Sequence, residues 1–293
     1  MASRSALLWM THVWSAETAR EFEKFYGMRD SATPEVWLLL DARTPGSNRI
    51  ADRYRRCLVH EERALFDLPY PKLAGHGLID HPHFPVWSFF LSHRDYDYYW
   101  VVEYDVRFTG QWERFLSSFG RYGHDLITSH IRRFDREPRW PWWGTLQHTG
   151  ETIPQQKRLR SFNVIYRLSN RAMHYIHEAM AAGWRGYPEV LLPTLLFHGG
   201  FRLLDFGGKS EFTPPGNRNR FYTSFGMHTG NLCFMGTMRY QPARAKAGHR
   251  RNKLYHPVKP PGMLTSAATK RSLAGRWLRE FGGYLRILCR KAG

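Results

Sequence analysis

The chain has few cysteines, no long hydrophobic run and a shortage of acidic residues. Its cysteines, Cys57, Cys233 and Cys289, are odd in number, far apart in 293 residues and outside any CxxC pair. Neither a disulfide framework nor a zinc site is therefore indicated, and a reducing, cytoplasmic compartment is the expectation. No segment reaches the roughly 20 apolar residues of a membrane-spanning helix. The short apolar stretch 6–13 predicts a first strand and not a signal peptide.

Acidic residues are scarcest near the C-terminus. The net charge is +18, from 43 Lys and Arg against 25 Asp and Glu. From Arg239 onward there are 14 basic residues and one acid, Glu280. Such a block favours phosphate-bearing partners, which include nucleic acid, anionic lipid and sugar nucleotides. Charge alone does not choose among them.

What the chain does contain is apolar surface in a regular pattern. Hydrophobic residues make up 42% and aromatic residues 15%, enough for a sizeable core. Residues 6–14 and 35–41 are predicted buried strands, and Ser15 is a plausible N-cap for a helix over 17–26 between them. Strand, helix and strand at this spacing form a βαβ unit. We expect a parallel sheet covered on both faces.

The alternation of strands and helices continues beyond this unit. Further strands are predicted at 96–106, 125–129 and 161–167, and helices at 112–119, 171–182 and from Glu189 onward. Residues 140–150 are rich in Trp, Pro and Gly without periodicity, which predicts an aromatic loop and a candidate acceptor site. Beyond Gly207 the chain is expected to be rich in loops. The fold class is α/β.

The last 31 residues, 263–293, form a predicted basic amphipathic helix. Apolar residues such as Trp277, Phe281 and Leu285 recur at helical spacing among arginines. This pattern suits a helix that docks on anionic lipid, which would make the protein peripheral on the inner face of the membrane. The pattern suits equally a helix that packs on the protein's own core.

Two carboxylates mark a candidate metal site. Glu103 and Asp105 are two apart on a predicted strand near its carboxyl end, so both side chains are expected on one side. Open α/β sheets bind ligands at that edge, and paired carboxylates suit Mg²⁺ or Mn²⁺. The alternative is a pair of solvated or salt-bridged acids at a strand end.

The stretch that contains this pair, YDYYWVVEYDVRFTG over 96–110, resembles the metal-binding strand of GT-A glycosyltransferases. It is similar in particular to a little-characterised family with an aromatic lead into an E-x-D-V-R motif. The resemblance follows the order of elements over about 6–260 and implies a GT-A-like (Rossmann-type) mixed, mainly parallel sheet flanked by helices. Glu103 stands where the usual motif has Asp.

The resemblance also implies a domain organisation and a function. Residues 1–262 would form the glycosyltransferase domain, with a nucleotide-sugar-binding part over 1–135 and an acceptor-side part over 136–262. The donor would be a nucleotide sugar bound with Mn²⁺ or Mg²⁺. The acceptor would be a glycan, a lipid-linked or another hydroxyl compound, as in polysaccharide biosynthesis. No specific nucleic acid is expected as a partner.

The same resemblance assigns further site residues. In Tyr255-His-Pro-Val-Lys259, His256 would complete the metal ligands and Lys259 would contact the diphosphate. Asp41 and Arg43, after the second strand, are where such enzymes often meet the nucleotide base. An exposed loop with one histidine among 15 is the alternative for residues 255–259.

The candidate general base is Glu189, an acid within the apolar run 187–194. The run is similar to the acceptor-side acidic motif of inverting GT-A enzymes, and apolar surroundings raise the pKa of a carboxylate. The acid could also simply favour a helix N-terminus. Asp205 is the reserve candidate for the base.

Two other interpretations compete with a transferase. Aromatic residues among arginines at 218–222 fit a basic nucleic-acid-binding protein without catalytic activity, although no known nucleic-acid-binding motif supports this. Asp80, His81, His83 and His93 could be metal ligands of a hydrolase. Prolines around them favour a loop in which these residues pack or lie at the surface.

Overall fold

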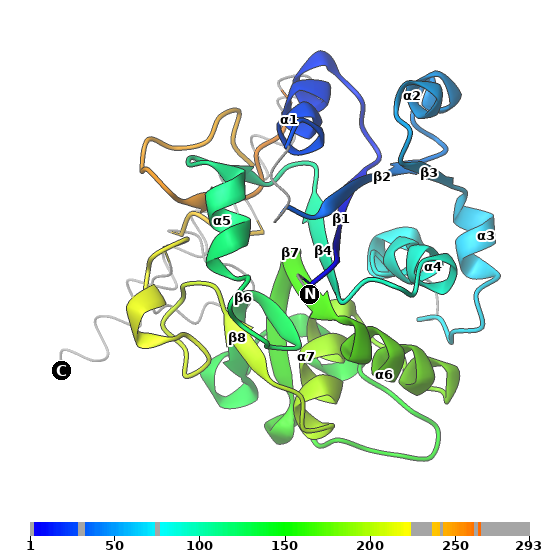
Figure 1. Ribbon diagram of the computed structural model, residues 1–293. Coiled ribbons are helices and arrows are strands. Elements are labelled where there is room, and N and C mark those ends of the chain that lie inside the picture. Colours follow the sequence, from blue (N-terminus) through cyan, green and yellow to red (C-terminus); the bar gives the residue numbers. More distant parts are fainter. Residues whose placement is uncertain are drawn as a thin grey trace.

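The protein is described by a computed structural model that covers residues 3–28, 33–73, 77–223, 236–240, 243–260 and 263–264. Its centre is a seven-stranded sheet in the order β3-β2-β1-β4-β7-β6-β8 (Figure 1). The strands are β1 (Ser5–Thr11), β2 (Glu35–Asp41), β3 (Cys57–His60), β4 (Tyr98–Glu103), β6 (Leu126–Arg133), β7 (Leu159–Ser169) and β8 (Leu203–Asp205). A second, two-stranded sheet pairs β5 (Arg107–Phe108) with β9 (Leu254–Tyr255).

The large sheet is mixed but mainly parallel. β1 pairs in parallel with β2 and β4, β2 with β3, and β6 with β8. β7 alone is antiparallel, to both β4 and β6. The expected mixed and mainly parallel sheet flanked by helices is confirmed.

Helices cover both faces of this sheet. The α-helices are α1 (Ala16–Tyr26), α2 (Ser47–Arg53), α3 (Glu62–Phe66), α4 (Phe84–Ser92), α5 (Trp112–Ser118), α6 (Asn170–Ala181) and α7 (Pro188–His198). Short 3₁₀ turns are η1 (Leu78–Asp80), η2 (Phe134–Arg136), η3 (Pro141–Thr145), η4 (Gln155–Lys157) and η5 (Pro215–Asn217).

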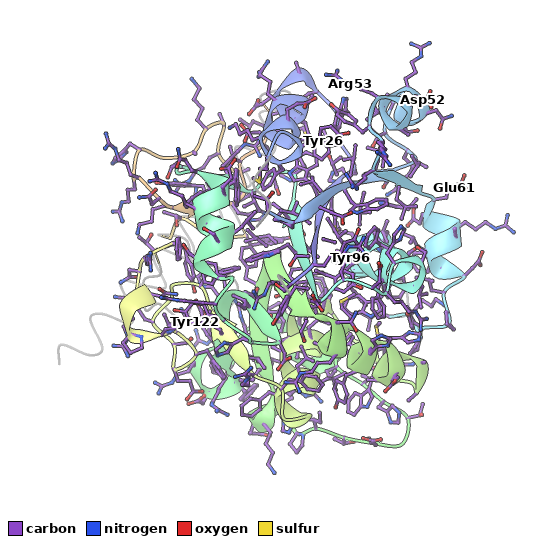
Figure 2. The ribbon with its side chains drawn as sticks, viewed as in Figure 1. Tyr26, Asp52, Arg53, Glu61, Tyr96 and Tyr122 are labelled. Atoms are coloured by element: carbon purple, nitrogen blue, oxygen red, sulfur yellow. The ribbon has the colours of Figure 1, made fainter. Side chains whose placement is uncertain are left out.

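Two hydrophobic cores lie on opposite faces of the sheet, because successive strand residues point to opposite sides. Leu8 of β1 belongs to the core that α4, α6 and α7 cover, whereas its neighbour Trp9 belongs to the core that α1 and α5 cover (Figure 1). Figure 2 shows side chains filling both layers, with Tyr96 inside and Asp52 and Glu61 at the periphery. Burial on both faces explains the near-continuous apolar strands.

The predicted helix starts are confirmed in atomic detail. The hydroxyl of Ser15 accepts a hydrogen bond from the backbone of Thr18, 3.1 Å away, and caps α1. Ser169 caps α6 in the same way through Ala172, at 3.2 Å. Each cap satisfies a backbone N–H that the helix leaves without an internal partner.

Several predicted strand bounds were wrong. The strand predicted over 96–106 is β4 and ends at Glu103, since a turn follows in which the Val106 N–H donates to the Glu103 carbonyl at 3.0 Å. Asp105 therefore lies beyond the strand, and the expectation that it shares a strand face with Glu103 is corrected. The strand predicted over 125–129 continues to Arg133, with two register shifts against β7. Because such register shifts interrupt the alternation of side chains along the strand, its full length could not be predicted from the sequence pattern.

Two further expectations concern membrane-spanning segments and the C-terminal helix. In the described ranges, no helix is long and apolar enough to cross a membrane. The predicted basic helix over 263–293 lies outside the described residues, apart from 263 and 264.

Candidate functional site

The site begins where β4 ends and the small sheet starts. Asp105 lies two residues before β5, and His256 immediately follows β9. Because Arg107 pairs with Tyr255 and Phe108 with Leu254, the two residues are brought together although 151 positions separate them. The Val258 N–H also donates to the Asp105 carbonyl at 2.8 Å. The two-stranded sheet thus fixes the site at the carboxyl edge of the large sheet.

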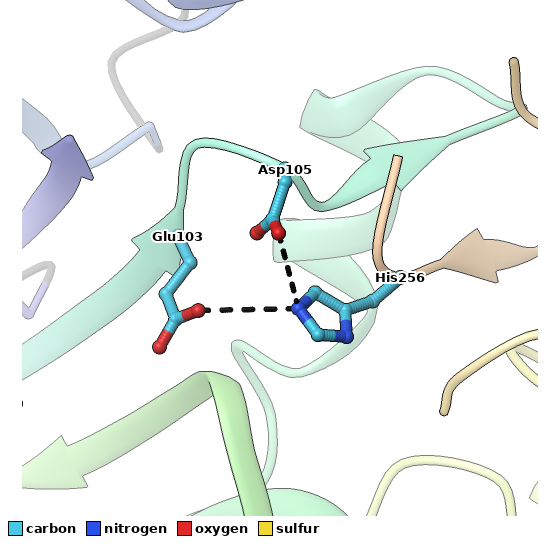
Figure 3. A group of neighbouring side chains, drawn as sticks. All are labelled: Glu103, Asp105 and His256. Atoms are coloured by element: carbon cyan, nitrogen blue, oxygen red, sulfur yellow. Dashed lines mark ion pairs between the residues drawn. The ribbon is translucent and has the colours of Figure 1, made fainter. Parts of the chain in front are cut away.

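Glu103, Asp105 and His256 converge on one point (Figure 3). His256 Nε2 lies 3.4 Å from Asp105 Oδ2 and 4.0 Å from Glu103 Oε2. One ligand atom from each of the three residues lies within 4.8 Å of the others. In the part of the chain that the structure describes, this is the one group of His, Cys, Asp and Glu so arranged. The expected metal ligands are brought together.

The donor atoms of this group suit a divalent cation. Asp105 Oδ1 is buried and has no hydrogen-bond partner among the described residues, so it keeps free lone pairs. The Arg239 carbonyl accepts from His256 Nδ1 at 2.7 Å, which leaves Nε2 as the ligating nitrogen. Two carboxylates and an imidazole form a plausible set for Mn²⁺ or Mg²⁺.

A lysine, Lys259, also contacts Asp105. Lys259 Nζ lies 2.6 Å from Asp105 Oδ2 and donates to the Tyr104 hydroxyl at 2.7 Å. Burial by itself would raise the pKa of Asp105, but the positive charges of His256 and Lys259 outweigh it and depress that pKa well below its usual range. Burial opposes the charge of Lys259, yet Asp105 raises its pKa to about 12. Asp105 is therefore ionised and Lys259 cationic at neutral pH.

Glu103 behaves differently from Asp105. The Glu103 side chain is 31% exposed to solvent, whereas that of Asp105 is 2% exposed. The exposed part of Glu103 lines the cleft described below. Loss of solvent, followed by the nearby negative charge of Asp105, raises the pKa of Glu103 to about 7. Burial lowers the pKa of His256, but Asp105 and Glu103 together raise it above its ordinary value. A bound cation would relieve the repulsion between the two acids.

A cleft of about 510 Å³ opens in front of these residues, within the usual range of ligand sites. Its wall carries side chains from the ends of β1, β2, β3 and β4, from the start of α7 and from the segment after β9. The sequence-predicted site residues that line it are Asp41, Arg43, Glu103, Asp105, Glu189, His256 and Lys259.

Asp41 and Arg43 form a pair at one end of the cleft. Asp41 is the last residue of β2, and the Arg43 guanidinium donates to its carboxylate at 2.7–3.2 Å. Burial would raise the pKa of Asp41, but the hydrogen bonds from Arg43 lower it. Burial also lowers the pKa of the neighbouring His60, which lines the same wall. This end offers an ionised carboxylate paired with a guanidinium, and a neutral imidazole.

Glu189 lies at the opposite end, as the second residue of α7 after Pro188. Its Oε1 accepts from the Asn163 N–H at 3.4 Å. The side chain is half-buried, and desolvation raises its pKa to about 7 although Arg160 opposes the rise. A carboxylate with a pKa near neutrality can accept and release a proton under working conditions.

Asp205 does not join this group. It is the last residue of β8, fully buried and absent from the cleft wall. Its carboxylate accepts hydrogen bonds from the backbone of Gly207, Gly208 and Ile131 and from the Tyr222 hydroxyl. These contacts hold the loop after β8 and leave the carboxylate no path to a substrate. The structure does not bring Asp205 to the site as a reserve base.

The histidines of the 80–83 segment pack as expected. His81 is buried and its ring nitrogens contact the Gly77 carbonyl and the Leu73 N–H, both at 3.0 Å. Burial lowers the pKa of His83 to about 3. His83 also lines the cleft, which the sequence did not predict.

Other residues of the site region escaped prediction although a sequence signal was present: Tyr104 lines the cleft, whereas Arg107 does not. Tyr104 and Arg107 lie inside the E-x-D-V-R motif. Tyr104 binds Lys259, while Arg107 is buried and donates to the carbonyls of Tyr104 and Val106, which braces the turn that presents Asp105. Tyr187 and Tyr240 also line the cleft; Tyr187 lies in the apolar run 187–194 that contains Glu189, and Tyr240 is an aromatic residue next to an arginine.

Comparison with known proteins adds little to this geometry. The family model described as Protein of unknown function (DUF3405) matches residues 47–128. That segment contains Glu103 and Asp105. No curated protein matches the chain.

Among solved structures, the chain is similar to glucosyl-3-phosphoglycerate synthase from Mycobacterium tuberculosis in complex with Mg²⁺ and uridine diphosphate. The identity is 12% and the TM-score 0.35, over 58% of this chain and 57% of that chain. The chain thus spans little more than half of that protein, and a match of this extent carries no argument about activity.

Proposed function

We propose that the protein is a metal-dependent glycosyltransferase that moves a sugar from a nucleotide-sugar donor to an acceptor hydroxyl. The observation that carries the proposal is the convergence of Glu103, Asp105 and His256 with Lys259 in one cleft at the carboxyl edge of the sheet. Open α/β sheets bind ligands at this edge. Carboxylates, an imidazole and a buried ammonium together suit a cation and a diphosphate.

The residues divide the cleft by chemistry. A cation would be held by Glu103, Asp105 and His256, and when bound it neutralises negative charge on the departing diphosphate. Lys259 supplies a second positive charge beside the same group. The end with Asp41 and Arg43 offers hydrogen-bond partners for the nucleoside part of the donor.

Glu189 is the proposed base. The acceptor oxygen forms a bond to the anomeric carbon of the donor sugar, and the hydroxyl proton passes to the Glu189 carboxylate. The bond between that carbon and the diphosphate oxygen breaks, and its electron pair leaves with the nucleotide. The raised pKa of Glu189 suits this proton transfer, and its place on the cleft wall suits contact with an acceptor.

Calorimetric titration tests the donor site. UDP and GDP are titrated into the wild-type protein with and without Mn²⁺ or Mg²⁺, and into an Asp105→Asn variant, which keeps the shape of the side chain but removes its charge. Asp135→Asn is the matched control, because Asp135 is exposed and absent from the cleft wall. We expect metal-dependent binding of one nucleotide that the control keeps and Asp105→Asn loses.

Two results would contradict the proposal. Absence of metal-dependent binding of either nucleotide to the wild-type protein would remove the donor site. Tight, salt-sensitive RNA binding in the same preparation would then favour a nucleic-acid-binding protein.

A further inference from the structure

A second, smaller cavity of about 90 Å³ adjoins the cleft. The two share four wall residues, Phe162, Tyr187, Glu189 and Tyr240. At about 30 Å³ per water molecule, the small cavity is too small for a nucleotide or a whole sugar, but it can take one edge of a substituted ring whose remainder lies in the adjoining cleft.

One side of this cavity is aromatic. Trp142 of η3 stacks on Tyr187, with ring centroids 4.9 Å apart and planes inclined by 20°. Tyr240 is 53% exposed, and Ile79 of the cleft is the only other large hydrophobic side chain so exposed among the described residues. An exposed aromatic face suits the apolar C–H face of a sugar ring, while the phenol at its edge can hydrogen-bond a hydroxyl. The predicted aromatic segment 140–150 thus contributes to a cavity wall.

The wall of this cavity also carries cationic side chains. Arg160 is buried, with Nη1 3.0 Å from Glu137 Oε2, while its Nε has no hydrogen-bond partner among the described residues. Glu137 is shared with Arg132, whose Nε lies 3.3 Å from Oε1, so one negative charge serves two guanidinium groups. Arg160 thus brings a buried positive charge to the cavity wall.

Arg239 adds a second guanidinium to the same wall. Burial, followed by repulsion from Arg244, lowers the pKa of Arg239 to about 10. Among the described residues that line the cavity, Glu189 is the only carboxylate. An anionic group here would gain charge-assisted hydrogen bonds and relieve repulsion between cations.

The cavity is connected to the proposed chemistry at two points. Glu189 lies on the walls of both cavities, so a hydroxyl held in the small one can face the base. The Arg239 carbonyl accepts the hydrogen bond that orients His256. A ligand in the small cavity would thus lie beside the proposed base.

We propose that the small cavity is the acceptor subsite and that it takes a sugar with an anionic substituent, either a carboxylate or a phosphate. This inference rests on the proposed transferase function. The sugar ring packs on Trp142 and Tyr240, its anionic group contacts Arg160 and Arg239, and one hydroxyl faces Glu189.

Binding of three probes tests the subsite. Methyl glucuronide, glucose 6-phosphate and neutral methyl glucoside are titrated into protein saturated with Mn²⁺ and with whichever nucleotide binds, so that the donor phosphate site is filled. We expect at least one anionic probe to bind about tenfold more tightly than methyl glucoside, the usual effect of a charge-assisted hydrogen bond. The glucuronide and the phosphate distinguish a carboxylate from a phosphate as the recognised group.

Two variants locate the contact. Arg239→Gln keeps the backbone carbonyl that accepts from His256 but removes the side-chain charge, so it is expected to weaken the preferred anionic probe about tenfold more than it weakens the nucleotide. Arg244→Gln is the control, because it removes a charge near Arg239 but does not line the cavity. Trp142→Ala is expected to weaken all three probes, since it removes the ring against which the sugar packs.

The outcomes separate this inference from the function on which it rests. Equal affinity for charged and neutral probes, or an unchanged affinity in Arg239→Gln, would overturn the anionic acceptor. Normal nucleotide binding with no sugar binding would overturn the subsite and keep the donor site. Absence of nucleotide binding would overturn the proposed function and, with it, the acceptor assignment.

Discussion

Replacing Glu189 with Gln should stabilise the protein and inactivate it at the same time. Glu189 is half-buried, and its pKa is raised from 4.5 to about 7. The folded state therefore holds the proton more tightly than the unfolded state does. The free energy of unfolding of the wild-type protein falls as the pH rises from the unfolded pKa to the folded one. Glutamine cannot ionise, so the free energy of unfolding of the Glu189→Gln variant does not fall in this way.

The size of the effect follows from the pKa change. At about 1.4 kcal/mol per pH unit, a rise from 4.5 to about 7 corresponds to roughly 3 kcal/mol above pH 7. The side chain faces two cavities that admit water, which reduces the expected gain to about 2 kcal/mol. Near pH 4.5 the gain should be close to zero, because the wild-type carboxyl is then largely protonated in the folded state. Glutamine also keeps the acceptor for the Asn163 N–H.

The assay is chemical denaturation of Glu189→Gln and wild type, without metal, at pH 4.5 and pH 8. Glu151→Gln is the control, since Glu151 is exposed and lines neither cavity. A stability difference that is the same at both pH values would refute the reasoning about desolvation. Sugar transfer by Glu189→Gln should fall by about 10²–10⁴, the usual contribution of a general base. A variant that is both stable and fully active would remove Glu189 from the chemistry.

Three further predictions concern the metal, the core and a helix cap. Mn²⁺ at about 100 times its dissociation constant should stabilise the wild-type protein by about 2.7 kcal/mol in a thermal melt, and an equal shift in Asp105→Asn would argue against the assigned ligands. Phe115→Ala should lower the free energy of unfolding by about 3–5 kcal/mol, because the ring is fully buried among aromatic residues under α5. Urea denaturation measures this loss, and a loss below about 1 kcal/mol would contradict the packing. Ser15→Ala should lower the free energy of unfolding by about 1 kcal/mol in the same assay, because it removes the cap hydrogen bond. The control Ser117→Ala, at an exposed residue, should lower it by less than about 0.5 kcal/mol, and equal losses would show that the cap does not contribute.

Local patterns in the sequence determined much of the fold. The apolar run 35–41 became β2 with the expected bounds, and Ser15 and Ser169 cap α1 and α6 as predicted. These features depend on neighbours within a few residues, through backbone hydrogen bonds and side-chain periodicity. The motif that contains Glu103 and Asp105 could be found for the same reason.

Only the tertiary structure decided which residues meet. His256 reaches Asp105 because β5 pairs with β9 over two residues each. Strands this short have no periodic pattern in the sequence from which the pairing could be predicted. Asp105 lies in a turn after β4, braced by the buried Arg107, whereas its spacing from Glu103 suggested a continuous strand.

The same limit separates Glu189 from Asp205. Both are acids in apolar segments, and in the sequence only the resemblance of the run 187–194 to a family motif ranked Glu189 first. In the folded chain, backbone N–H groups from the loop after β8 and from β6 surround Asp205, while Glu189 lines two cavities. Sequence sets the propensity of each segment, but the environment of a carboxylate depends on distant segments that fold against it.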